Sequence, residues 1–188
     1  GTVIGAVFSF PISFLAANNV AANNLSETTK QILNGIRAFP ELILAFVFLP
    51  ITGLGALTGT LAIGIHSIGT LGKLSSEVIE GIDEGPLEAI KSSGGSKINE
   101  LLFGVVPQVM PTITSYWLYR FEINLRASAV LGVVGAGGVG AELINQLRFR
   151  DFPRAGTVLV ATVVLVLTVD TISAAIRRRI IKGRSIKV

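Results

Sequence analysis

Few side chains in this sequence could do chemistry, and their types leave little room for an enzymatic site. The chain has no cysteine and a single histidine, His66. Composition therefore argues against a thiolate nucleophile, a zinc–thiolate centre, a histidine metal site or a Ser-His-Asp triad. The phosphate-binding pattern G-x-x-x-x-G-K-[ST] does not occur. We expect no catalytic residue, no metal and no cofactor.

Two arginines and an acid lie close together after a long uncharged run. Arg120, Glu122 and Arg126 follow residues 101–119, which contain no Asp, Glu, Lys or Arg. One interpretation is an interfacial ion pair, either Arg120–Glu122 or Glu122–Arg126 at helical spacing. The functional alternative is that Arg120 or Arg126 lines a path and attracts an anion, because guanidinium forms strong charge-assisted hydrogen bonds with oxyanions.

Three further ionisable residues lie in or beside apolar runs. Asp170 is the one charged residue of 155–176, where an acid is costly and usually faces the protein interior. We expect it to pair with residues on the Arg177 side or to cap a helix, rather than to relay protons. His66 is predicted to be packed and hydrogen-bonded, with a path-lining role as the alternative. Glu41 follows Pro40, and a helix-terminus partner for Lys or Arg is as good an interpretation as a functional role.

A glycine-rich run matches a nucleotide-binding pattern. Residues 135–140 read G-A-G-G-V-G after an apolar stretch, which fits G-x-G-x-x-G. That fingerprint needs a βαβ unit in a doubly wound sheet, and the surrounding sequence predicts neither. Gly132, Ala136 and Gly140 recur every four residues, so we interpret the run as a tightly packed or flexible membrane segment near an outer gate.

The elements that must position these residues are membrane helices. Apolar residues make up 50% of the chain and charged residues only 15%, against about 25% charged in soluble domains. A span of the bilayer core takes about 20 mostly apolar residues. The apolar runs, with few charged residues, predict an all-α polytopic membrane protein with about five spans, at 1–17, 32–49, 56–74, 104–121 and 155–176. In the third span, Gly55, Gly59, Ala62 and Gly69 suit close helix–helix packing.

Basic residues give the expected orientation. With the C-terminal tail in the cytoplasm, eleven Lys and Arg residues fall inside and five outside, as the positive-inside rule requires. Residues 18–31 and 75–103 are then cytoplasmic, and 50–55 and 122–154 external. We expect one transmembrane domain over residues 1–188, with an N-terminal part of the natural chain missing because the sequence opens inside an apolar run without Met.

The cytoplasmic segment 75–103 predicts a short isolated helix. Gly85-Pro86 should end the preceding helix and start a new one with Pro at its first position. Gly94-Gly95 should stop this helix, with glycine supplying a positive φ. Ser96 can then cap the next helix, and Pro107 opens the following span. An ordinary solvated loop is the alternative interpretation.

This segment resembles the cytoplasmic "EAA" loop of binding-protein-dependent ABC-importer permeases. Glu88-Ala89-Ile90, Gly94 and Pro107 fall on the motif, with Ile90 replacing its second alanine and Val106 replacing a leucine. More specifically, the chain resembles the permease subunit of phosphonate importers over about residues 30–150. The stretches that carry this resemblance are 37–42, 66–74, 103–111, 119–126 and 129–140.

The resemblance implies a type I ABC-importer (MetI-like) permease fold in the cytoplasmic membrane. It implies two paired permease subunits, most simply a homodimer, with ATPase subunits inside and a substrate-binding protein outside. ATP hydrolysis would belong to the ATPase subunits, and no nucleic acid is involved. Glu88, Ala89 and Gly94 would couple to the ATPase, while Arg120, Arg126 and His66 are candidates for the path of a phosphorus oxyanion.

Two other classes of protein remain open at this point. A proton-coupled secondary transporter of a small anion would use Asp170 and His66, but it leaves the EAA-like segment unexplained. An intramembrane enzyme would need a catalytic pair at matched depth, and Asp170 is the single acid deep in a span. Copurification with an ATPase subunit distinguishes the importer from both.

Overall fold

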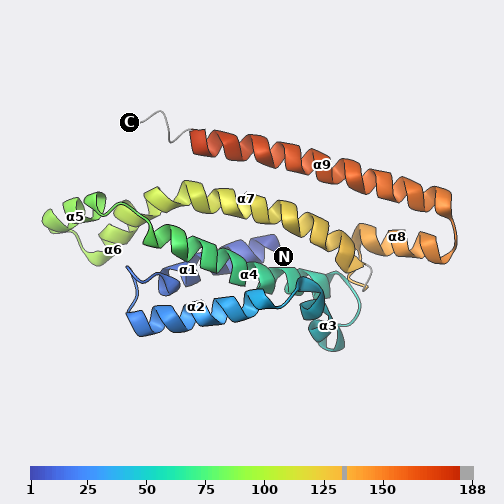
Figure 1. Ribbon diagram of the computed structural model, residues 1–188, viewed down its shortest axis with the longest axis horizontal. Helices are drawn as coiled ribbons and strands as arrows, with labels where there is room; N and C mark the ends of the chain where they lie inside the picture. Colours follow the sequence, from blue (N-terminus) through green and yellow to red (C-terminus); the bar gives the residue numbers. More distant parts are fainter. Residues whose placement is uncertain (133–134, 183–188) are drawn as a thin grey trace.

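The computed structural model describes residues 1–132 and 135–182, and all its regular elements are helices (Figure 1). In chain order they are α1 (Thr2–Ala16), α2 (Asn23–Ala38), α3 (Glu41–Thr52), α4 (Ala56–Glu80), α5 (Gly85–Ser92), α6 (Lys97–Asn99), the π-helical turn η1 (Glu100–Val105), α7 (Val106–Leu131), α8 (Gly138–Arg148) and α9 (Phe152–Lys182). The all-α prediction is confirmed. The basic tail was expected after Ile176, but residues 177–182 continue α9, and residues 183–188 lie outside the described residues.

Helix α4 is the centre of the bundle, because α1, α2, α3 and α7 all pack on it. Its small residues make this possible. A side chain at Gly59 would come within 2.9 Å of the Ala136 Cβ, and one at Gly69 within 2.9 Å of Ile36. Ala62 is fully buried, so the predicted close packing holds for these three residues. It is wrong for Gly55, which precedes the helix with a φ of 153° and open space around it.

The predicted span over 32–49 is broken in the middle. Helices α2 and α3 meet at an angle of 87°, with the break at Phe39 and Pro40. Phe39 has an extended backbone (φ −86°, ψ 122°), because the proline ring disfavours the helical region for the preceding residue. The break makes Glu41 the first residue of α3 and turns its side chain toward α4 and α7.

The fourth predicted span is longer than its uncharged run. Continuous helical structure runs from Lys97 to Leu131, so residues 122–131, expected in an external loop, are helical. The π-turn η1 lies just before Pro107, which has no N–H to offer the carbonyl four residues back. The Val106 N–H instead donates to the Leu101 carbonyl five residues back, which continues the helix across the proline.

The helices place the predicted cytoplasmic segments at one end of the molecule. In Figure 1, α5, α6, the start of α2 and the C-terminal end of α9 lie toward the left, whereas α3 and α8 lie toward the right. By length and composition, Lys97–Leu131 and Phe152–Ile180 can each cross a membrane, and the bent pair α2–α3 adds a third span if it counts as one. All five predicted spans contain helix, but α1 has only 15 residues, so the five-span topology stays a prediction.

Candidate functional site

Helix α5 carries the EAA-like residues and projects from the end of the bundle. It begins at Gly85 with Pro86 in its first turn and ends at Ser92, as the sequence predicted. Glu88 and Ala89 are exposed, and Glu88 lies in the first turn, where a carboxylate complements the helix N-terminus. Among the described residues, Glu88 forms no ion pair. The two side chains are therefore presented outward.

Two glycines end α5 in a defined hydrogen-bonded turn. The Gly94 N–H donates to the Lys91 carbonyl at 3.1 Å, and the Gly95 N–H donates to the Ile90 carbonyl at 2.9 Å. This is the Schellman pattern, in which the residue after the C-cap takes a left-handed conformation. Gly94 does so, with a φ of 79°, which confirms the prediction. Ser96 then caps α6 by accepting from the Asn99 N–H.

The inner face of α5 is fixed to η1 and α7. A Cβ at Gly104 would lie 3.1 Å from Leu87 Cδ1 and 3.4 Å from Ile90 Cδ1, so both apolar side chains rest on this glycine. Ile90, the departure from the motif's alanine, thus belongs to the packed face. Gln108 of α7 completes the attachment: its Oε1 accepts from the Asp83 N–H at 3.0 Å, and its Nε2 donates to the Asp83 carbonyl at 3.1 Å.

A second candidate site is a polar cluster inside the helix bundle. Arg120, predicted at an interface, is only 6% exposed in α7. Its Nη2 lies 2.9 Å from Glu41 Oε1, and the His66 Nδ1 lies 3.0 Å from the same carboxylate oxygen. Arg120 Nη2 also contacts His66 Nδ1 directly. Three helices, α3, α4 and α7, therefore bring an acid, an imidazole and a guanidinium to one point.

Hydrogen bonds extend this cluster to α1. Arg120 Nε donates to Ser67 Oγ at 3.2 Å, and Asn124 Nδ2 donates to Ser67 Oγ at 2.9 Å. Asn124 Nδ2 also donates to Thr2 Oγ1 at 2.9 Å. Thr2 and Asn124 in turn line a partly open cavity of about 320 Å³, together with residues of α4, α9 and the turn before α8. A chain of polar groups thus joins the cluster to this cavity.

The remaining charges of α7 pair with α9, which corrects both predicted ion pairs within α7. Glu122 Oε1 lies 3.3 Å from Arg177 Nη2, and Arg126 Nη2 lies 3.4 Å from Asp170 Oδ2. Each helix carries an acid followed by an arginine. Because α7 and α9 run antiparallel, the acid of each helix faces the arginine of the other. Asp170 faces the protein, as predicted, although its partner is Arg126.

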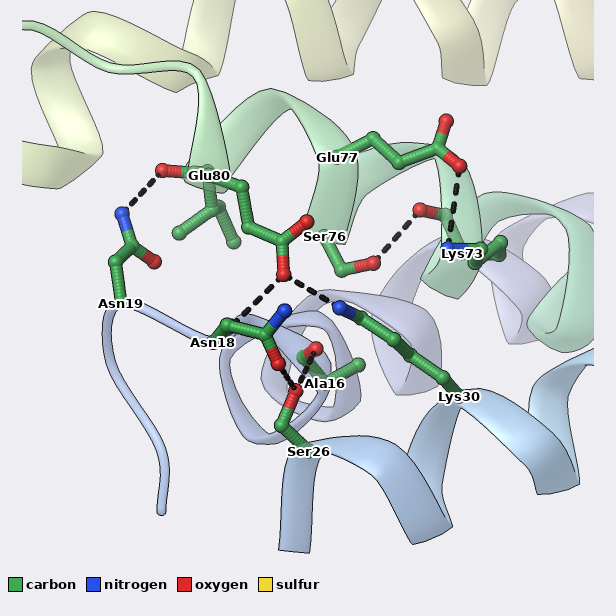
Figure 2. Close-up of polar contacts among 10 residues, drawn as sticks. Ala16, Asn18, Asn19, Ser26, Lys30, Lys73, Ser76, Glu77 and Glu80 are labelled. Atoms are coloured by element: carbon green, nitrogen blue, oxygen red, sulfur yellow. Dashed lines mark hydrogen bonds and ion pairs between the residues drawn. The ribbon is translucent and has the colours of Figure 1, made fainter. Parts of the chain in front are cut away.

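Another polar junction ties the ends of α1, α2 and α4 together (Figure 2). Glu80 Oε1 accepts from Lys30 Nζ at 2.7 Å and from the Asn18 N–H at 2.8 Å. Burial raises the pKa of Glu80, but these hydrogen bonds outweigh burial and hold its pKa below the ordinary value. Ser26 lies in the first turn of α2. It is buried, with its Oγ 2.6 Å from the Ala16 carbonyl.

The glycine-rich run forms the turn between α7 and α8. Gly135, Gly137 and Gly138 have positive φ values, and residues 133–134 lie outside the described part. A Cβ at Gly132 would come within 2.6 Å of the Gly140 Cα, so the run is tightly packed as predicted. No strand adjoins it in the described chain, and the dinucleotide fingerprint lacks its structural context.

Sequence reasoning missed two contacts of the candidate sites. The meeting of Glu41 with Arg120 and His66 depends on the break at Pro40; the only signal was an acid directly after a proline inside an apolar run. The contact of Gln108 with Asp83 had a weaker signal in the sequence, which was an amide side chain directly after Pro107. Asp170 and His66, which a proton-coupled transporter would need on one path, engage different residues of α7, so the structure does not favour that alternative.

Solved structures share this helical arrangement. A chain of the MetNI methionine ABC transporter in an inward-facing conformation matches with a TM-score of 0.78, covering 95% of this chain and 90% of that chain at 21% identity. A chain of an amino acid ABC transporter crystallised with histidines matches with a TM-score of 0.73, covering 95% and 86% at 20% identity. The fold is therefore that of these ABC-transporter chains.

The family follows from sequence. Residues 9–184 match the family described as binding-protein-dependent transport system inner membrane component, and the chain belongs to that family. It is 41% identical to the phosphite transport system permease protein PtxC of Stutzerimonas stutzeri, over 95% of this chain and 65% of that protein. It is also 41% identical to the phosphate-import permease protein PhnE of Mycolicibacterium smegmatis, over 95% of this chain and 34% of that protein. The chain spans less than two thirds of either relative.

A third relative is shorter. The putative cryptic phosphonate transport system permease protein PhnE2 of Escherichia coli is 45% identical over 64% of this chain and 99% of that protein. The names of the three relatives refer to phosphite, phosphate and phosphonate, which are all phosphorus oxyanions.

Proposed function

We propose that this chain is the permease subunit of an ATP-driven importer that carries a phosphorus oxyanion across the cytoplasmic membrane. The observation that carries the proposal is the run of relatives at 41–45% identity whose names refer to phosphite, phosphate or phosphonate transport. The family described as binding-protein-dependent supports a substrate-binding protein as partner. The permease itself performs no bond chemistry, and ATPase subunits hydrolyse ATP.

Helix α5 is the proposed coupling element. Glu88 and Ala89 would enter a groove on the ATPase subunit, and Gly94 would hold the helix end in the required turn. Because Leu87 rests on Gly104 and Gln108 bonds Asp83, movement of α5 would pass directly to α7. Two copies of the permease would then respond together as the ATPase subunits close and reopen.

The proposed path uses the polar cluster rather than the periphery. Arg120 and His66 converge inside the bundle and can act on an anion, as guanidinium and imidazolium donors do. Arg126 is the weaker candidate, because its side chain is 54% exposed and already faces Asp170.

A reconstituted transport assay tests the function. The full-length permease is coexpressed with its ATPase and binding protein, purified, and placed in proteoliposomes. We expect ATP-dependent uptake of labelled phosphite that methylphosphonate or phosphate inhibits and sulfate does not. Glu88→Lys should reduce ATPase copurification, whereas the exposed control Glu27→Lys in α2 should not. Failure of the wild-type permease to associate with an ATPase would contradict the proposal.

Topology is tested separately. The chain has no cysteine, so single cysteines at Ser96, Asn145 and Ser185 report cleanly. We expect an impermeant reagent added to intact cells to label Asn145→Cys and to spare the other two. External labelling of Ser96→Cys would place α5 on the wrong side for ATPase coupling.

A further inference from the structure

The Glu41 carboxylate occupies the position that a bound anion would take in the polar cluster. One of its oxygens lies 2.9 Å from Arg120 Nη2 and 3.0 Å from His66 Nδ1. The two nitrogens come from different helices, α7 and α4, and converge on a single oxygen atom. Such a pair, one planar guanidinium and one imidazole, is a good receptor for an oxyanion.

We propose that Arg120 and His66 form an oxyanion site in which Glu41 is the resident anion, and that cargo enters by displacing the Glu41 side chain. The proposal rests on the function proposed above and assigns its cargo-binding residues. The ligand class is a small phosphorus oxyanion. Glu41 thereby acts as an internal competitor, which occupies the site whenever cargo is absent.

Glu41 is the member of the cluster that can leave. Its side chain is 23% exposed, against 11% for His66 and 7% for Arg120. It belongs to α3, the half-helix that follows the 87° break, and it turns on flexible single bonds. Arg120 is held by Ser67 as well as by Glu41, so the guanidinium keeps a second partner when the carboxylate leaves.

The charge of Arg120 requires that the cargo replace the Glu41 carboxylate directly, rather than enter after Glu41 has left. If Glu41 swung away alone, Arg120 would be a buried charge without a counter-ion, which is strongly unfavourable. An incoming oxyanion removes that cost as it arrives, and the returning carboxylate removes it again as the cargo departs. Passage needs such weak and reversible binding, because a site that held its ion tightly would not release it.

A nearby cavity is linked to the cluster by hydrogen bonds. Asn124 and Thr2 line the space of about 320 Å³ and are bonded through Ser67 to Arg120. The other acids of this region are already committed, since Glu122 faces Arg177 and Asp170 faces Arg126. Glu41 is therefore the acid whose displacement frees Arg120, which is linked through Ser67 and Asn124 to this cavity.

Binding to the full-length permease in lipid nanodiscs, without ATPase or binding protein, tests the proposal. The probe is methylphosphonate, followed by phosphorus NMR line broadening. Glu41→Gln removes the resident charge and should bind the probe at least tenfold more tightly than the wild type. Glu41→Gln/Arg120→Gln should lose that gain. Glu122→Gln, which neutralises an acid paired with α9, should bind like the wild type.

The outcomes are distinct. If folded Glu41→Gln bound no better than the wild type, or if the double variant kept the gain, the resident-anion proposal would be wrong. If Glu41→Gln fails to fold, Glu41→Asp is the second variant, because it keeps the charge on a shorter side chain. An intermediate gain in binding would support the proposal, and the absence of any gain would overturn it. Equal binding of sulfate would leave the site standing but count against the proposed cargo class. If the wild type took up phosphite normally but Glu41→Gln showed no gain in binding, the proposed function would stand and the resident-anion site would be wrong.

Discussion

Glu41 and Arg120 lie 79 positions apart in the chain, yet their side chains meet at 2.9 Å inside the bundle. The pair joins α3 to α7, and α3 otherwise packs mainly on α4. Removing one partner of a buried ion pair leaves the other charge uncompensated, which costs far more than the intact pair contributes. The contact therefore holds α3 against α7 while Glu41 and Arg120 are paired.

The same substitution at two arginines of α7 should have unequal effects. Arg120→Gln leaves Glu41 without its guanidinium partner and should lower the free energy of unfolding by about 3 kcal/mol. Arg126→Gln breaks a half-exposed pair with Asp170 and should cost less than about 1 kcal/mol. Oxyanion uptake should fall in the first variant and stay near normal in the second. Thermal unfolding in detergent and proteoliposome uptake measure both effects, and equal losses would contradict the assignment of Arg120.

Local patterns in the sequence predicted the elements better than their partners. Apolar runs located α1, α4, α7 and α9, but not the start of α2. Gly94-Gly95 predicted the end of α5, because these signals act within a few residues. The pairing of Arg120, Glu122 and Arg126 was predicted wrongly. Residue spacing predicts contacts between neighbours on one helix. These side chains instead contact α3 and α9, whose positions depend on tertiary packing.

The break at Pro40 shows that local sequence patterns also leave the direction of the backbone undecided. A proline inside an apolar run can lie within a span, as Pro111 does in the continuous helix α7, or end it. Pro40 ends α2 and reorients the chain by 87°. That difference decides whether Glu41 faces lipid or Arg120, and hydrophobicity alone cannot distinguish the two outcomes.

Two glycines with open space around them separate backbone strain from steric clash. A Cβ meets nothing within 4 Å at either Gly94 or Gly35, but Gly94 has a φ of 79° and Gly35 is helical. Gly94→Ala should cost about 1–2 kcal/mol locally and weaken ATPase association. Gly35→Ala should be neutral or stabilise α2 by up to about 1 kcal/mol.

Asparagine tolerates a left-handed backbone better than alanine does, so Gly94→Asn should recover part of the association. Copurification yield and cargo-stimulated ATP hydrolysis report the result. If Gly94→Ala and Gly35→Ala behaved alike, the turn after α5 would have no part in coupling.

Gln108 should matter for coupling more than for stability. Gln108→Leu removes the two hydrogen bonds to Asp83 that attach the start of α5 to α7, for a net loss of about 1–2 kcal/mol. We expect ATPase association to persist and the ATP hydrolysed per molecule of cargo to rise. Gln146→Leu, whose amide bonds only Glu142 within α8, is the matched control. An unchanged ratio in Gln108→Leu would show that α5 transmits its motion by another route.

Acid should loosen the junction of α1, α2 and α4 before it unfolds the bundle. The folded-state pKa of Glu80 lies below its ordinary value of 4.5, so the folded state favours the charged carboxylate. Its contribution to stability is fully present above pH 4.5 and is lost as the pH falls through the lower, folded-state pKa. Glu80→Gln should remove about 1 kcal/mol at pH 7 and flatten this part of the acid transition.

Amide hydrogen exchange at the junction of α1, α2 and α4 distinguishes local loosening from global unfolding. At pH 7, the Asn18 amide, which donates to Glu80 at 2.8 Å, should exchange faster in Glu80→Gln than in the wild type. Glu77→Gln provides the control, because Glu77 pairs only with Lys73 one turn earlier on the same helix and is half exposed. Faster exchange at Asn18 in both variants, or in neither, would contradict the role of Glu80.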